Sequence, residues 1–477
     1  MSGRLVAAFF FALAVVSWVA LRRASRKSCI SQIPGPKSPS WIYGKESRLM
    51  VSDPLATKFI LNSPIFAHGA AQHKAANSMF GHGNIFLAQE DYHRHLRNIM
   101  NPSFSSQNVR RMLPMVKDVG MKLVDRWETL GYPGTTVDIT QTMHEAALDL
   151  MGEAIFEHPF NGLTGQSEMA KIQRAVLETV SSVSKPSQLV DACLPYIPDF
   201  IFRLTLQLPI PAIRTLQQYI NATDELGRQL ARQERSNMSS EKDRTFISRL
   251  IKPDSPDATA GVIDEAIGVH VRTILLAGED TTGNTLSWIL YRLAMAPDFQ
   301  QALREEVQLA TANSGDNIDY ENMPLLNAII NETLRLYSSL PFTERVAKRD
   351  CILPLSQPIT TTTGSQITEM PIEKGQAIYV AISSYHRLTS LWGPDADEFR
   401  PSRWLEGQPC KGTALGPHAS LWRFALMEMQ VLVTEIVRKF ILSLPAGDST
   451  KPCYRLSLVA KTADGVQEIP IHIENVA

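Results

Sequence analysis

The stretch LLAGEDTTGNTLSWIL, from Leu275 to Leu290, lies inside a long apolar segment of helical character, from Ile263 to Met295. Glycine weakens a helix and threonine hydroxyls compete for its carbonyls, so a Gly-Glu-Asp-Thr-Thr cluster within a buried helix has a cost. The cluster therefore predicts a local opening of the helical hydrogen bonds that makes room for a small ligand or water. Asp280 and Thr281 can relay protons into such a gap. The alternative is a polar kink, or a helix start near Asp280.

Two further segments carry charged residues at informative spacing. In NETLRLYSSLP, residues 331–341, Glu332 and Arg335 lie three apart on one helical face. Alone this pattern is weak, because an exposed i,i+3 salt bridge has the same spacing. In FRPSRW, residues 399–404, Arg403 can complete a buried Glu332–Arg335–Arg403 cluster, which is costly if any member is missing.

Taken in this order, the three segments resemble the signature of the cytochrome P450 family. AGEDTT resembles the oxygen-binding helix motif A-G-x-D/E-T-T, ETLR resembles E-x-x-R, and FRPSRW resembles F-x-P-x-R-F/W. HRHLR and TERVAKRD resemble the helix and the strand whose basic residues contact the haem propionates, here His93, Arg97 and Arg345. The resemblance covers nearly the whole chain and looks closest to fungal microsomal members of secondary metabolism.

The resemblance implies haem b held by a cysteine thiolate, which favours O–O cleavage. It implies that Ala277 and Gly278 line the cofactor, that Asp280 and Thr281 deliver protons, and that His418 faces a propionate. Electrons would come from NADPH through NADPH-cytochrome P450 reductase. The implied function is a haem-dependent monooxygenase that oxidises a hydrophobic small molecule such as a terpenoid or polycyclic compound.

The ligand loop departs from the family pattern. GPHASLWRF, residues 416–424, lines up with G-P-H-x-C-x-G-W-R-F, but Ser420 stands at the metal-ligand position of the cysteine and the following glycine is absent. A serine hydroxyl is neutral and hard, whereas a thiolate is anionic and polarisable. The alternatives are therefore a catalytically inactive scaffold that binds an apolar ligand or a partner enzyme, or a haem protein ligated by His418 or Cys410. The chain is also short between Trp41 and Asp53, so either a decayed gene or misplaced exon edges account for both losses.

The N-terminus predicts a membrane anchor. The apolar run Leu5–Leu21 is within the range for a spanning helix, and Arg22, Arg23, Arg26 and Lys27 follow it. A cleaved signal peptide is the rival, but the basic cluster follows the apolar run instead of preceding it. Positive-inside logic places the remainder in the cytosol, and the resemblance to microsomal members implies a single-pass protein of the endoplasmic reticulum membrane.

The whole chain of 477 residues, 44% hydrophobic with a net charge of −1, has no basic excess, which argues against a nucleic-acid partner. Its five cysteines are scattered, which argues against disulfides or a structural zinc site. The pattern reads as helix from Pro54 to Glu344 and as short strands from Arg345 to Ser384. After Ser420 a helix should bury one stripe and leave Glu428, Glu435 and Lys439 off it. The end of the chain, residues 454–473, reads as a hairpin.

We therefore expect an α+β, mainly α protein with the cytochrome P450 fold and an N-terminal transmembrane anchor. The expected organisation is an anchor with its basic flank at residues 1–28, a proline-rich hinge at 29–45, and a catalytic domain at 46–477. The prolines at positions 34, 36 and 39 make the hinge stiff and extended.

Overall fold

The computed structural model describes residues 29–35, 48–129, 134–181, 193–237, 245–251, 260–315, 317–407, 423–454 and 457–476. The expected anchor and the hinge beyond residue 35 lie outside these ranges. Within them, no helix combines the length and the apolar character that crossing a membrane requires.

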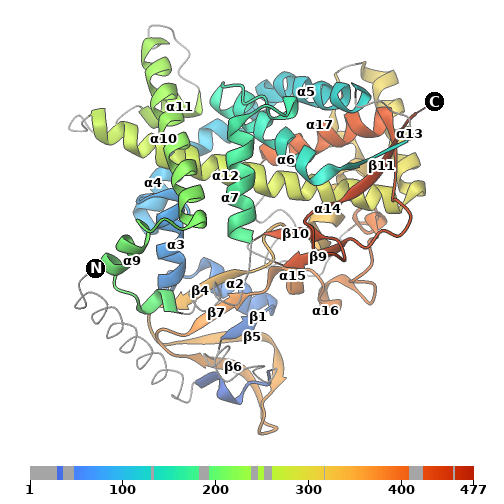
Figure 1. Ribbon diagram of the computed structural model, residues 1–477. Helices are drawn as coiled ribbons and strands as arrows, with labels where there is room; N and C mark the ends of the chain where they lie inside the picture. Colours follow the sequence, from blue (N-terminus) through green and yellow to red (C-terminus); the bar gives the residue numbers. More distant parts are fainter. Residues whose placement is uncertain are drawn as a thin grey trace.

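Helices dominate the fold, as predicted, and most of the long ones lie in the upper part of Figure 1, whereas α2, α15 and α16 lie lower, near the strands. The α-helices are α2 (Pro54–Asn62), α3 (Ala70–Phe80), α4 (Glu90–Met100), α5 (Ser106–Thr129), α6 (Ile139–Leu150), α7 (Glu168–Ser181), α9 (Asp199–Thr205), α10 (Pro211–Asn237), α11 (Phe246–Ile251), α12 (Ala260–Met295), α13 (Pro297–Ser314), α14 (Pro324–Leu336), α15 (Ile382–Tyr385), α16 (Thr389–Trp392) and α17 (Arg423–Lys439). Short 3-10 helices are η1 (Cys29–Gln32), η2 (Asn101–Phe104), η4 (Gly162–Thr164), η5 (Leu194–Tyr196), η6 (Tyr320–Asn322) and η7 (Pro401–Trp404), and η3 (Met151–Phe156) is a π-helix.

The strands of the described ranges form four small sheets. One has the order β1 (Leu49–Val51), β7 (Ala377–Val380), β4 (Thr343–Ala347), β2 (Phe66–Ala67). Beside it at the bottom of Figure 1 is the antiparallel pair β5 (Cys351–Thr360) and β6 (Gln366–Ile372). The others are the order β3 (Thr135–Asp138), β11 (Pro470–Asn475), β8 (Phe440–Ser443) and the pair β10 (Leu458–Lys461), β9 (Lys451–Tyr454).

The long helix α12 forms the centre of the helical part and packs against α6, α10, α14 and α17. Its buried side chains join those of α5, α6 and α17 in the larger hydrophobic core. A second core lies between α2 and the strands β1, β4, β5, β6 and β7. The second core therefore combines the strand-rich segment that follows residue 345 with α2 and β1 from the start of the described chain.

Two local predictions are wrong. The end of the chain is not one hairpin, because β10 pairs with β9, whereas β11 pairs with β3 and β8. Ile471 and Ile473 explain this, since both are fully buried against the helical core. On α17, Glu428 and Glu435 are buried together with the apolar stripe, because neighbouring helices cover α17 on several sides.

The third correction concerns the polar cluster of α12. The helix is α-helical without interruption from Ala260 to Met295, so its hydrogen bonds do not open near Asp280. The irregular segment lies in the adjacent element instead, where α6 continues into the π-helix η3.

Candidate active site

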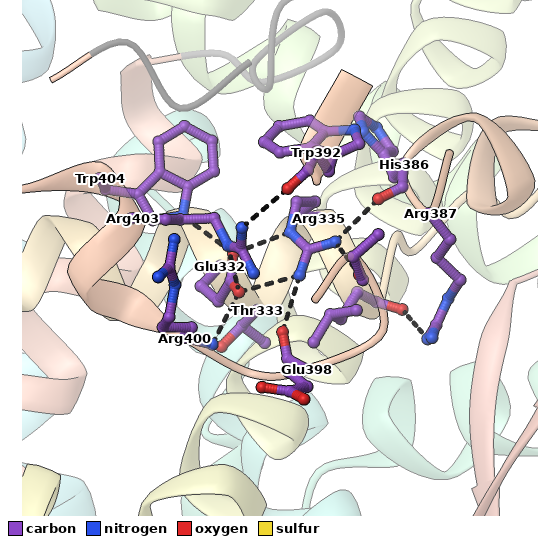
Figure 2. Close-up of polar contacts among 12 residues, drawn as sticks. Glu332, Thr333, Arg335, His386, Arg387, Trp392, Glu398, Arg400, Arg403 and Trp404 are labelled. Atoms are coloured by element: carbon purple, nitrogen blue, oxygen red, sulfur yellow. Dashed lines mark hydrogen bonds and ion pairs between the residues drawn. The ribbon is translucent and has the colours of Figure 1, made fainter. Parts of the chain in front are cut away.

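Glu332 is the centre of a buried ionic cluster (Figure 2). Arg335 donates to both of its oxygens, from Nε to Oε2 at 2.8 Å and from one terminal nitrogen to Oε1 at 2.9 Å. Arg403 Nε donates to Oε1 at 2.9 Å, and Trp404 Nε1 donates to Oε2 at 3.0 Å. The structure therefore brings together the three charged residues singled out in the sequence and adds Trp404, whose role the motif alone did not reveal.

The same two guanidinium groups also donate to backbone oxygens. Arg335 donates to the carbonyls of His386, Ala396 and Glu398, and Arg403 donates to those of Trp392 and Asp395. Burial raises the pKa of Glu332, but the hydrogen bond and the charge of Arg335 outweigh it, so that the pKa lies below its ordinary value. The cluster thus fixes the chain from 386 to 404, which precedes the ligand loop by eleven residues, onto α14.

One face of α12 stays open although the helix is central. Ala277 and Thr281 lie one turn apart and are exposed. Glu279, which lies between them in the sequence, and Thr282, which follows Thr281, are buried. Thr281 Oγ1 donates to the carbonyl of Ala277 at 2.8 Å. This face therefore presents a methyl group and a hydroxyl group next to each other.

Asp280 makes its polar contacts away from that face. Asn284 Nδ2 donates to Asp280 Oδ1 at 2.9 Å, and the side chain of Ser457 also hydrogen-bonds the carboxyl group. Burial raises the pKa of Asp280, and the nearby charge of His144 opposes that shift. Asp280 and Thr281 are therefore neighbours in sequence with different surroundings.

Gly278 allows α12 to approach the π-helix closely. A Cβ atom at this position would lie 2.4 Å from Sδ of Met151, which is closer than real contacts allow. The contact that the structure shows for this glycine is thus packing against η3.

The expected propionate-binding side chains come from two elements. His93 and Arg97 lie on α4, and burial lowers the pKa of both side chains. Arg345 lies on β4 and donates to Thr343 Oγ1 and to the carbonyl of Glu344, both at 2.8 Å. Burial lowers the pKa of Arg345. Within the described part of the chain, no carboxylate lies within ion-pair distance of its guanidinium group.

His68 also belongs to this region and was missed by the sequence. Its Nδ1 lies 3.4 Å from a terminal nitrogen of Arg345, and its ring stacks on Phe86 at 5.1 Å between centroids. Burial and the charge of Arg345 lower the pKa of His68 to about 4, so the imidazole is neutral near pH 7. No sequence pattern indicated it, because the contact joins β4 to the turn after β2.

The remaining two predicted site residues, His418 and Ser420, lie outside the described residues, as does Cys410. The helix that follows them, α17, begins at Arg423, close to where the sequence predicted it.

The sequence model of the cytochrome P450 family, described as "Cytochrome P450", matches residues 30–467. The chain belongs to the cytochrome P450 family. It is 28% identical to "Cytochrome P450 monooxygenase claU" of Ampulloclitocybe clavipes over 80% of this chain and 74% of that protein. It is 27% identical to "Cytochrome P450 monooxygenase 205" of Postia placenta over 97% of this chain and 96% of that one.

The fold agrees with this assignment. The crystal structure of a cytochrome P450 (CYP102L1) superposes with a TM-score of 0.71 and 21% sequence identity, covering 90% of this P450 and 92% of that chain. The family's cofactor is a haem iron, supplied with electrons by a redox partner.

The described residues fit haem on its distal and propionate sides. The exposed face of Ala277 and Thr281 can lie against a flat apolar group, and Arg345, a partly buried cation that meets no carboxylate among the described residues, suits an anionic propionate. The sequence pattern aligns Ser420 with the family's cysteine ligand, and a serine hydroxyl at that position would not supply the thiolate chemistry of the family.

Proposed function

We propose that this P450 belongs to a haem-dependent monooxygenase line of fungal secondary metabolism that oxidises hydrophobic small molecules, with a terpenoid or polycyclic compound as the expected substrate class. The observation that carries the proposal is the open face of Ala277 and Thr281 on α12, with the uncompensated cation of Arg345 on β4. The two named fungal relatives, both called monooxygenases, support it.

Each residue has a separate role in this proposal. Arg345 and Arg97 hold the propionates by charge and hydrogen bonds, and His93 holds them by a hydrogen bond. Thr281 presents its hydroxyl to the open face, and Asp280 holds a proton one residue away at a carboxyl group whose pKa is raised. Haem, when bound, supplies the oxygen chemistry.

The proposal includes a membrane and a reductase. We place the protein at the endoplasmic reticulum membrane through the apolar run Leu5–Leu21, with the catalytic part in the cytosol and NADPH-cytochrome P450 reductase as the electron donor. A second apolar area supports membrane contact, because large side chains of α9 and the turn after it are exposed: Phe200, Leu204, Leu208 and Ile210. Fractionation with and without residues 1–28 tests this, and an unchanged soluble fraction for both would reject it.

Ser420 favours a second candidate function. A chain with serine at the ligand position and no glycine after it would be an inactive P450 scaffold that binds an apolar ligand or a partner enzyme. The intact Glu332 cluster is compatible with this, because it maintains the fold rather than the chemistry.

The absorption spectrum of the reduced, carbon-monoxide-bound protein separates the two. The chain itself is compared with a variant that carries Ser420→Cys and a glycine inserted after Leu421. The strongly red-shifted band of thiolate-ligated haem in the chain itself would show that another cysteine, Cys410, reaches the iron. That band in the repaired variant alone would identify a monooxygenase fold whose ligand loop is the lesion. Its absence from both would refute the monooxygenase proposal.

A further inference from the structure

A polar cavity lies between α6, α7 and α12, on the side of α12 where Asp280 makes its contacts. Its volume is about 80 Å³, and its inner wall is formed by His144, Glu279 and Asp280. Arg174 and Glu178 line it too, and their side chains are more than half exposed. A volume of this size accommodates several water molecules, so the cavity gives the inner carboxyl groups contact with solvent.

His144 connects the two acidic residues of the inner wall. Its Nδ1 lies 2.8 Å from Glu279 Oε1, and its side chain also hydrogen-bonds Asn284. Asn284 in turn donates to Asp280 Oδ1 at 2.9 Å. The side-chain amide of Asn284 therefore bridges the imidazole of His144 and the carboxyl group of Asp280, which should hold the proton.

The backbone is arranged to admit this imidazole. A Cβ atom on Gly283 would lie 2.9 Å from Cγ of His144, so any other residue at 283 would displace the ring. On the other side of the pair, Gln173 Nε2 donates to Glu279 Oε2 at 2.8 Å and fixes the carboxylate that faces the ring. The position of His144 is thus determined by three helices.

The charge of His144 is maintained despite burial. Burial alone would lower its pKa, but the charge and hydrogen bond of Glu279, followed by the charge of Asp280, raise the pKa to about 9. The other charged or titratable groups that face this region are Asp138, Glu145, Arg174, Glu178 and Tyr219.

We propose that His144 is a positioning residue that acts through Asp280, holding a positive charge against Glu279 so that the Asp280 carboxyl can release its proton. The inference rests on the proposed function, in which Asp280 is the proton-holding group. Interaction between two titrating groups is reciprocal, so the shift that Asp280 causes in His144 equals the shift that His144 causes in Asp280.

The test is a nuclear magnetic resonance titration of the chain as it exists, with labelled histidine and with His144→Gln to assign the signal. The native His144 signal should titrate near pH 9, and its midpoint should fall in both Glu279→Gln and Asp280→Asn. Glu145→Gln is the matched control, because Glu145 lines the same cavity but pairs with Arg126. The midpoint of the His144 signal in Glu145→Gln should equal that in the native protein.

Two results would overturn the inference. One is a titration midpoint of His144 near the ordinary value of 6.5 in the native protein. This result does not depend on whether any variant folds. The other is a midpoint in Asp280→Asn that is the same as in Glu145→Gln. These outcomes do not depend on haem ligation, so they are distinct from a failed carbon-monoxide spectrum.

The repaired variant with Ser420→Cys adds a functional measurement. Since the positive charge of His144 lowers the pKa of Asp280, which acts in its protonated form, His144→Gln should move the alkaline limb of the pH–rate profile to higher pH and leave KM unchanged. His270→Gln, at a buried histidine of α12 whose pKa is lowered to about 4, is the control. An unmoved alkaline limb in His144→Gln would contradict the inference.

Discussion

Replacing Glu428 by glutamine should stabilise this P450 more strongly as the pH rises. Glu428 lies on α17 and is almost completely buried. Its Oε2 accepts a hydrogen bond from Thr282 Oγ1 at 3.1 Å, and within the described residues its Oε1 has no hydrogen-bond partner. Burial without a neighbouring cation raises the pKa of this carboxyl well above 4.5. Glutamine has the same shape, can accept the same hydrogen bond and carries no proton to lose.

The magnitude follows from proton linkage. Above pH 4.5 the unfolded chain releases the proton of Glu428 while the folded protein keeps it, so folding takes up one proton. The free energy of unfolding of the native protein should therefore fall, relative to Glu428→Gln, by about 1.4 kcal/mol for each pH unit. This window begins at pH 4.5 and ends at the raised folded-state pKa.

Urea denaturation followed by tryptophan fluorescence at several pH values measures this difference. Glu435→Gln is the matched control, because Glu435 is buried on the same helix but lies 2.9 Å from Arg438, so its loss should not stabilise the protein. Native and Glu428→Gln curves that stay parallel across the whole range would refute the reasoning.

Three other variants follow from the site. Arg403→Gln removes one of the two buried guanidinium groups that donate to the Glu332 carboxylate and should cost about 3–5 kcal/mol in unfolding free energy, whereas Lys171→Gln in the exposed pair with Glu168 should cost under about 1 kcal/mol. Equal losses in urea denaturation would reject the buried-cluster argument. Gly278→Ala should lose about 1–3 kcal/mol by overpacking against Met151, and the same substitution should cost less in a Met151→Ala background, measured as thermal midpoints. Arg345→Gln should weaken haem binding in a haem titration by about 1.5–3 kcal/mol, and unchanged affinity would remove Arg345 from the propionate site.

The sequence predicted those features that depend on local order. The chain segment from 343 to 380 contains four strands because its β-branched residues and glycine turns specify them locally. The Glu332 cluster was predictable because two short motifs supply all three charges. The mainly helical P450 fold followed from the ordered set of motifs.

The sequence could not show features that depend on which elements meet in space. His144 and Glu279 are 135 residues apart, and no local pattern marks their contact. Glu428 was expected off the buried stripe because helical periodicity describes one partner surface, whereas α17 is enclosed by several. The polar cluster of α12 was expected to break its own helix, but the irregularity lies in η3, where packing against Gly278 is closest.

The backbone contacts of the Glu332 cluster bear on how this P450 can evolve. Arg335 and Arg403 together bind the carbonyl oxygens of His386, Trp392, Asp395, Ala396 and Glu398. A carbonyl oxygen is present whatever the side chain, so substitutions at 396 and 398 leave these hydrogen bonds available. Side-chain substitutions can therefore accumulate at positions 396 and 398 without changing how the two arginines hold this segment against α14. Loss of Glu332 alone, by contrast, would leave two buried guanidinium groups without the carboxylate that they share.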